Sequence, residues 1–247
     1  MTAFWIALQF LTTFPVQLKA MPTPQQNGQS LLFYPVVGLM IGVILFAIAS
    51  VLHAVPIVLL SSVILVIWIW LTGGLHLDGL ADTADAWVGG FGDAERTLKI
   101  MKDPACGPIG VLSLIIICIL KWSAIYLLLQ KQMYIALLLF PVLGRVAPLI
   151  LFLTTNYVRA KGLGRSIVST MPRKSAWLLV MVIVCGSFYF SWLGLIACMS
   201  MMIGLWYLRR KFIQRIGGIT GDTVGASIEI IECVSLLVFT MGSFYLR

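Results

Sequence analysis

The sequence predicts an all-α membrane protein, a single polytopic bundle of about seven transmembrane helices with a short interfacial or re-entrant helix at the N-terminus. Two observations lead to this fold class. Of the 247 residues, 60% are hydrophobic and 11% are charged, whereas soluble domains have about 45–50% apolar and about 25% charged residues. The apolar residues also form continuous runs of roughly the 20 residues that cross a bilayer as a helix, without the alternation of a membrane β-barrel.

The expected elements follow in chain order. Residues 3–18 contain an apolar run that is too short for a span and stops at Pro15. The segment also lacks the basic start of a signal peptide, so we expect an interfacial or re-entrant helix there. We divide the 33-residue run 176–208 into two spans with the turn at Gly194. All of residues 1–247 belong to one membrane domain, and single spans are expected at 31–54, 56–75, 108–129, 133–153 and 226–246.

The distribution of Lys and Arg supports seven spans. Thirteen of the 17 basic residues fall in segments 19–30, 76–107, 154–175 and 209–225, which seven spans place on one side of the membrane. Loops on the cytoplasmic side are enriched in Lys and Arg, so we assign these segments to the cytoplasm. Because the bilayer accounts for the basic balance, we expect no nucleic-acid partner.

Acidic residues are confined to two regions of the chain, with six in residues 78–103 and three in residues 222–232. Asp78, Asp82 and Asp85 have the spacing i, i+4, i+7, which places them within about 60° of one another on a helix. Three carboxylates in this register repel one another unless a cation neutralises them, and Mg²⁺ prefers such oxygen ligands. A solvated acidic surface is the alternative, which we favour less because cytoplasmic faces are enriched in bases.

Basic residues near these acids are candidates for binding phosphate. Arg96, Lys99 and Asp103 share a helix face, with Lys102 beside them; ordinary surface ion pairs explain this segment equally well. In the loop 159–165, Lys161 and Arg165 alternate with glycines whose exposed amides also suit phosphate, although a simple positive-inside loop is the alternative. Pro104 and the pair Gly107 and Gly110 indicate a tight return into the next span.

The start of the last span combines a glycine-rich segment with ionisable groups. Gly221, Asp222 and Thr223 lead into a helix, where backbone amides can bind an anion, although Asp222 can also act only as an N-cap. Deeper in the membrane lie Glu229 and Glu232, and also Arg145 in the fourth span. Ionisable groups at such depth normally pair inside the bundle. We therefore expect Arg145 to pair with Glu229 or Glu232, and Lys121 to extend outward.

The segment 73–86 reads G-x-H-L-D-G-x-A-D-T-x-D from Gly74 to Asp85, and it is followed by 96–110 and by G-D-T-V-G-A at 221–226. In motif, order and length the chain resembles the adenosylcobinamide-GDP ribazoletransferase (cobalamin synthase) family. The resemblance implies a Mg²⁺-dependent enzyme of the inner membrane of a prokaryote, with its active-site loops in the cytoplasm. Such an enzyme joins α-ribazole, or its 5′-phosphate, to adenosylcobinamide-GDP and releases GMP.

The resemblance also implies roles for residues at matching positions. Asp78, Asp82, Asp85 and Asp222 are candidate ligands of Mg²⁺, and Asp82 or His76 would accept the proton of the attacking hydroxyl. Substrate contacts are expected from His76, Arg96, Lys102, Asp103 and Arg145, to which the residue patterns above add Lys161, Arg165, Gly221 and Thr223. A homo-oligomer and docking of other cobalamin-assembly enzymes are compatible with this assignment.

Two other classes of protein fit parts of the pattern. A prenyltransferase or a CDP-alcohol phosphotransferase also uses acid-rich helices with diphosphate donors, although the D-x-x-D-G-x-x-A-R string of the latter is absent. A transporter would use Asp78–Asp85 and Arg145 as a path for an ion or solute.

Overall fold

The computed structural model describes residues 2–18, 20–160 and 163–245. In these residues the regular structure is helical, with one isolated bridge between Tyr157 and Ile219, so the predicted all-α class is confirmed. The helices are α1 (Thr2–Leu11), α2 (Pro24–Ser30), η1 (Leu31–Phe33), α3 (Tyr34–Val51), α4 (Ile57–Thr72), α5 (Leu75–Gly89), α6 (Ala94–Ile100), α7 (Pro108–Gln130), η2 (Tyr134–Leu138), α8 (Leu139–Thr154), α9 (Leu163–Thr170), α10 (Arg173–Gly186), η3 (Ser187–Phe190), α11 (Ser191–Ile216) and α12 (Gly221–Tyr245).

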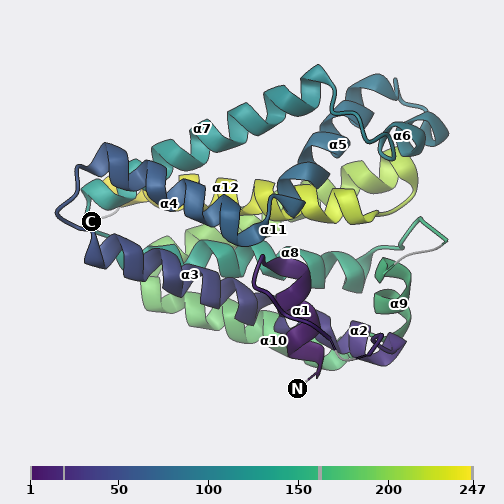
Figure 1. The fold of residues 1–247 in the computed structure, drawn as a ribbon, viewed down its shortest axis with the longest axis horizontal. Helices are drawn as coiled ribbons and strands as arrows, with labels where there is room; N and C mark the ends of the chain where they lie inside the picture. The colour runs from purple at the N-terminus through teal and green to yellow at the C-terminus, as the bar shows by residue number, and fades with distance from the viewer. Residues whose placement is uncertain (1, 19, 161–162, 246–247) are drawn as a thin grey trace.

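Helices α8 and α12 form the centre of the bundle, and the other long helices surround them (Figure 1). In the most apolar stretch of each segment, 83% of the residues are buried in Tyr134–Thr154 (η2 and α8) and 72% in α12, against 17% in Arg173–Ile216, which contains α10 and α11. A helix that is apolar on all sides and faces other helices belongs to the interior, while the same composition on the outside faces lipid. Any charged group on α8 or α12 therefore has to find its partner within the protein.

Five helical segments are long and apolar enough to span a membrane, and the bent pair of α4 and α5 makes a sixth. One of the five, Arg173–Ile216, contains a reversal of the chain. Arg173 at its start donates to the carbonyl of Leu153, and Arg209 near its end donates to the carbonyl of Thr154, so both ends lie at the same end of α8. The chain is thus an integral membrane protein, and the number of seven spans stays a prediction.

The reversal occurs a few residues before the expected turn at Gly194. It is formed by η3 and by Ser191, whose φ is +56°. A side chain at Gly194 would collide with the backbone carbonyl of Ser187, so this glycine allows α11 to pack closely on the turn. The expected position of the turn is therefore wrong, because the glycine serves a close approach after the turn.

The expected span 56–75 ends in a sharp bend. Gly73 and Gly74 both have left-handed backbone, with φ of +62° and +70°, which glycine adopts without the strain of a side chain. The axis turns by 87° there, between α4 and α5. Helix α5 then lies against the first turns of α12 and α7, and we treat α4 as the membrane-spanning part and α5 as the part at the end of the bundle.

The N-terminal helix is short, as expected for a segment that does not cross the membrane. The ten residues of α1 extend about 15 Å at 1.5 Å per residue, half of the hydrocarbon thickness. Its buried face includes Leu8 and Leu11, and the following Thr13 donates its backbone N–H to the carbonyl of Leu71. This contact brings α1 to the bend that precedes α5.

Candidate active site

Helix α5 presents the predicted row of carboxylates. Asp78 is exposed, and Asp82 and Asp85 are partly buried on successive turns. The helix begins directly after the left-handed Gly74, so the bend determines where the row starts. The sequence spacing is therefore realised on one helix at the end of the bundle opposite the C-terminus (Figure 1).

Two glycines bring α5 into close contact with the start of α12. A Cβ at Gly79 would lie 2.8 Å from the backbone carbonyl oxygen of Asp222, and a Cβ at Gly225 would lie 3.5 Å from the backbone of His76. At Gly79 only a hydrogen atom in place of a side chain permits this approach, whereas a Cβ at Gly225 would make an ordinary van der Waals contact. As a result, Asp222 lies beside the carboxylate row although 144 residues separate it from Asp78 in the sequence.

A cavity of about 190 Å³ opens at this crossing and is lined by Asp78, Asp222 and His76. Its other walls are mostly apolar and come from distant parts of the chain. Sequence reasoning missed these wall residues because no local pattern distinguishes them from other membrane-facing side chains. They include Phe10, Tyr34, Phe152, Tyr157, Val224 and Ile228.

The carboxylates create a local excess of negative charge. The pKa of Asp82 is raised to about 6; partial burial is the largest cause, and the neighbouring carboxylates of Asp78, Asp222 and Asp85 act in the same direction. The positive charge of Arg159 opposes this effect. The group therefore favours a bound cation electrostatically.

Two of the predicted metal ligands already have partners in the protein. Asp85 accepts hydrogen bonds from the backbone N–H groups of Gly107 and Gly110, at 2.7 and 2.8 Å. It thereby caps the start of α7 and forms the tight return that Gly107 and Gly110 predict. Asp222 is paired with Arg159 at 2.6 Å. Within the described ranges, no three His, Cys, Asp or Glu side chains are arranged as a metal site, so metal binding stays a prediction.

The basic loop contributes a residue that was not singled out from the sequence. Arg159 contacts Asp222, while Arg165 is exposed on α9, next to Gly164 in the cavity wall. Lys161 lies outside the described residues. The alternation of bases with glycines indicates the loop as a whole, but not which base reaches the carboxylates.

Of the other predicted substrate contacts, Gly221 lines the cavity, and Arg96, Lys102, Asp103 and Thr223 do not. Arg96 is exposed and lies over the ring of Phe91, and Lys102 is exposed in the loop after α6. Asp103 accepts a hydrogen bond from the N–H of Ala105. Gly221 lines the cavity, whereas the buried Thr223 hydroxyl accepts from the N–H of Thr220 and so stabilises the start of α12.

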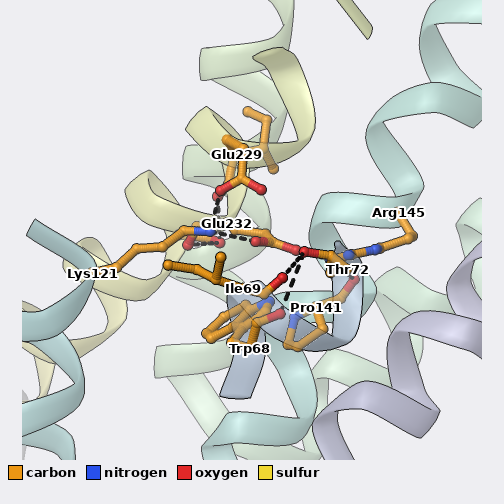
Figure 2. A network of polar contacts seen from close by, with 10 residues as sticks. Trp68, Ile69, Thr72, Lys121, Pro141, Arg145, Glu229 and Glu232 are labelled. Carbon is orange, nitrogen blue, oxygen red and sulfur yellow. Dashed lines mark hydrogen bonds and ion pairs between the residues drawn. The ribbon is translucent and has the colours of Figure 1, made fainter. Parts of the chain in front are cut away.

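A buried network of four charged side chains joins α7, α8 and α12 (Figure 2). Arg145 pairs with Glu232, and Lys121 pairs with Glu229 at 2.6 Å and with Glu232 at 2.5 Å. The predicted pairing of Arg145 is thus confirmed for Glu232. A side chain at Gly144 would collide with Glu232, so this glycine makes room for the pair.

The expectation that Lys121 extends outward is wrong. Its side chain is 5% exposed, its ammonium group lies 4.7 Å from the centre of the Trp68 ring, and it neutralises Glu229. Two carboxylates in the interior require two cations, and Arg145 supplies only one. Arg145 itself is fully buried and does not line the cavity, so its placement supports the ion pair and gives no support to a direct substrate contact.

Comparisons with known proteins match the whole chain. The family profile described as Cobalamin-5-phosphate synthase matches residues 3–240. A protein of Acinetobacter baumannii named adenosylcobinamide-GDP ribazoletransferase is 58% identical over 246 residues, covering 100% of both chains. A protein of the same name from Pseudomonas fluorescens is 49% identical over 240 residues, covering 96% of this chain and 98% of its own. No solved structure matches the chain.

Proposed function

The chain belongs to the cobalamin-5-phosphate synthase family and is a transferase, and we propose that it joins α-ribazole or its 5′-phosphate to adenosylcobinamide-GDP with release of GMP. The observation that carries the proposal is the crossing of α5 and α12, which brings Asp78 and Asp222 into the lining of one cavity. Phosphoryl transfer depends mainly on positioning and on neutralising charge, and this group of carboxylates is suited to recruit the cation. Family membership favours this reaction over the prenyltransferase, CDP-alcohol phosphotransferase and transporter alternatives.

We assign Mg²⁺ binding to Asp78, Asp82 and Asp222. The fit rests on the donor set, since these side chains supply hard oxygen ligands and Arg159 alone does not balance their charge. When bound, the metal would neutralise the diphosphate of the donor. Asp85 has a positioning role in this assignment, because both of its oxygens accept hydrogen bonds from the start of α7.

The reaction is a displacement at the phosphorus attached to cobinamide. The 3′-hydroxyl oxygen of the ribose forms the new bond to that phosphorus, and the bond to the GMP oxygen breaks, with its electron pair leaving on GMP. We assign the hydroxyl proton to Asp82, which is partly accessible on the face shared with Asp78, whereas His76 is 3% exposed. Arg165 and the bases of the α6 region are exposed, and we assign to them the attraction of the donor phosphates.

We place the site on the cytoplasmic side of the inner membrane. Support comes from the basic side chains that gather at this end of the bundle: Arg209 donates to Thr154 at the end of α8, and Arg215 donates to the carbonyl of Trp87 at the end of α5. Such an excess of bases is typical of the cytoplasmic side. A homo-oligomer and docking of other enzymes at these loops remain predictions.

The test uses purified protein in detergent with adenosylcobinamide-GDP, α-ribazole and Mg²⁺, and it measures GMP and the cobalamin product. Wild type should release one GMP for each cobalamin formed. Asp82→Ala should lose activity by at least about a hundredfold, the scale of removing a group that acts on the transition state, while still inserting and eluting as folded protein. Glu95→Ala removes an exposed carboxylate of α6 and should retain activity. Undiminished turnover of Asp82→Ala would remove Asp82 from the site.

A further inference from the structure

The lining of the cavity combines polar groups with aromatic rings. Asp78, Asp222 and Gly221 contribute to the polar part, and the rings come from four segments of the chain, Phe10, Tyr34, Phe152 and Tyr157, of which Tyr157 has its hydroxyl close to Gly221. The rings of Phe10 and Tyr34 stack with centroids 6.2 Å apart, and those of Phe152 and Tyr157 stack at the same distance. A ligand that fits here has to carry a flat apolar group on one side and a polar, reacting group on the other.

His76 adds a further polar group to the lining of the cavity. The side chain is 97% buried, since its exposed fraction is 3%, and it lines the cavity. Neither ring nitrogen has a hydrogen-bond partner among residues 2–18, 20–160 and 163–245. Buried polar groups are normally hydrogen-bonded, so an unpaired imidazole in the wall of a cavity indicates a partner that comes from a ligand.

Resting on the proposed function, we infer that this cavity binds the benzimidazole base of α-ribazole, with an N–H of His76 donating a hydrogen bond to the unsubstituted ring nitrogen of the base. The base would contact the aromatic walls, with Phe10 at the rim. The ribose would then extend to the carboxylates of Asp78 and Asp222, where its 3′-hydroxyl has to meet the cobinamide-linked phosphate. His76 is thereby a positioning residue for the acceptor.

Size and polarity favour this base over the other parts of the two substrates. At about 190 Å³ the cavity is below the roughly 300–1,000 Å³ of sites for drug-sized ligands, so it suits one bicyclic ring system and excludes the corrin ring. Guanine carries several donors and acceptors along its edge, and packing it against Phe10 and Phe152 would leave part of that edge unpaired. A dimethylbenzimidazole ring has a single free nitrogen, which matches the single imidazole.

The experiment combines protein variants with an altered ligand. Binding of α-ribazole and of its indole counterpart, in which C–H replaces the free ring nitrogen, is measured by calorimetry on the full-length protein in detergent. Wild type should bind the indole riboside about tenfold more weakly, the scale of one hydrogen bond. In His76→Phe, which retains an aromatic ring and lacks the donor, the two ligands should bind equally.

A second pair of variants tests the aromatic wall without disturbing the core. Phe10 is 42% exposed, and Phe10→Ala should weaken α-ribazole binding about 5- to 150-fold, the range for losing one aromatic stack on a base, with the KM for adenosylcobinamide-GDP unchanged. Trp5→Ala is the matched control, because Trp5 is 46% exposed on the same helix and does not line the cavity. It should leave both values unchanged.

The outcomes separate this inference from the proposed function. If product forms but His76→Phe still discriminates between the two ribosides, or Phe10→Ala affects only the donor, the base binds elsewhere and the inference is overturned while the transferase function stands. If wild type binds and discriminates as expected but forms no cobalamin, the proposed function fails and the binding site stands. Absence of α-ribazole binding at millimolar concentration overturns the inference directly.

Discussion

The charge network between α7, α8 and α12 makes a strong prediction about stability. Glu232 contacts both cations of the network, and the four side chains are at most 6% exposed. Replacing Arg145 by Met leaves two carboxylates with one ammonium group, and replacing Glu232 by Met leaves two cations with one carboxylate. Breaking a buried pair in this way costs about 3–5 kcal/mol, so each single variant should lose that much of its free energy of unfolding.

The double variant Arg145→Met with Glu232→Met should cost less than the roughly 6–10 kcal/mol obtained by adding the single values. It leaves Lys121 paired with Glu229 at 2.6 Å, and the network is again neutral. Apolar replacement of a whole buried pair is often close to neutral, so we expect the double variant to lose less than about 3 kcal/mol.

The assay is reversible unfolding in mixed micelles, followed by fluorescence as the fraction of denaturing detergent rises. Arg145→Met combined with Thr240→Val is the control, because Thr240 is buried on α12 and has no hydrogen bond to the network within the described part of the chain. That pair should be additive within about 0.5 kcal/mol. The same additivity for Arg145 and Glu232 would refute the network as an energetic unit.

The remaining predictions concern the site. Asp85→Ala should destabilise the start of α7 by about 1–2 kcal/mol, the cost of losing a helix cap. The measurement is hydrogen exchange of the backbone amides there, which should become faster. Asp85→Asn keeps one acceptor and should restore part of the protection of these amides against exchange. Gly79→Val places a side chain 2.8 Å from the carbonyl oxygen of Asp222 and should reduce GMP release more than tenfold. The control Gly186→Ala, at a position where a Cβ contacts no other atom, should leave GMP release unchanged. Equal activity of the two variants would contradict the close crossing of α5 and α12. Chelation should stop GMP release, and added Mg²⁺ should restore it. Asp78→Ala should raise the Mg²⁺ concentration for half-maximal activity, and an unchanged Mg²⁺ titration would exclude Asp78 as a ligand.

Local patterns in the sequence predict the carboxylate row well. The spacing of Asp78, Asp82 and Asp85 needs only a helix to place them on one face, and the helix is present. Pro and Gly predict the return into α7, although not that Asp85 forms it. The pairing of Arg145 follows from the energetic cost of isolated charges in a membrane, and this reasoning works without knowledge of the helix arrangement.

The features that were missed depend on which faces of the helices meet. Helix α7 is apolar around most of its surface, so hydrophobic periodicity does not indicate whether Lys121 points inward or to lipid. The cavity walls join Phe10, Tyr34 and Phe152 through packing of helices that are distant in the sequence. A turn assigned to Gly194 was also misplaced, because a glycine that permits close packing and a glycine that permits a turn have the same sequence signal.

The cavity also has a consequence for biosynthesis. Phe10 and Leu11 in its wall belong to α1, while Val224 and Ile228 belong to α12. The two halves of the pocket are thus separated by more than 200 residues of intervening chain, and no nascent fragment that lacks α12 contains both. The pocket is complete only when α12 has inserted, so the segments made before α12 have to hold their positions without a ligand bound in the finished pocket.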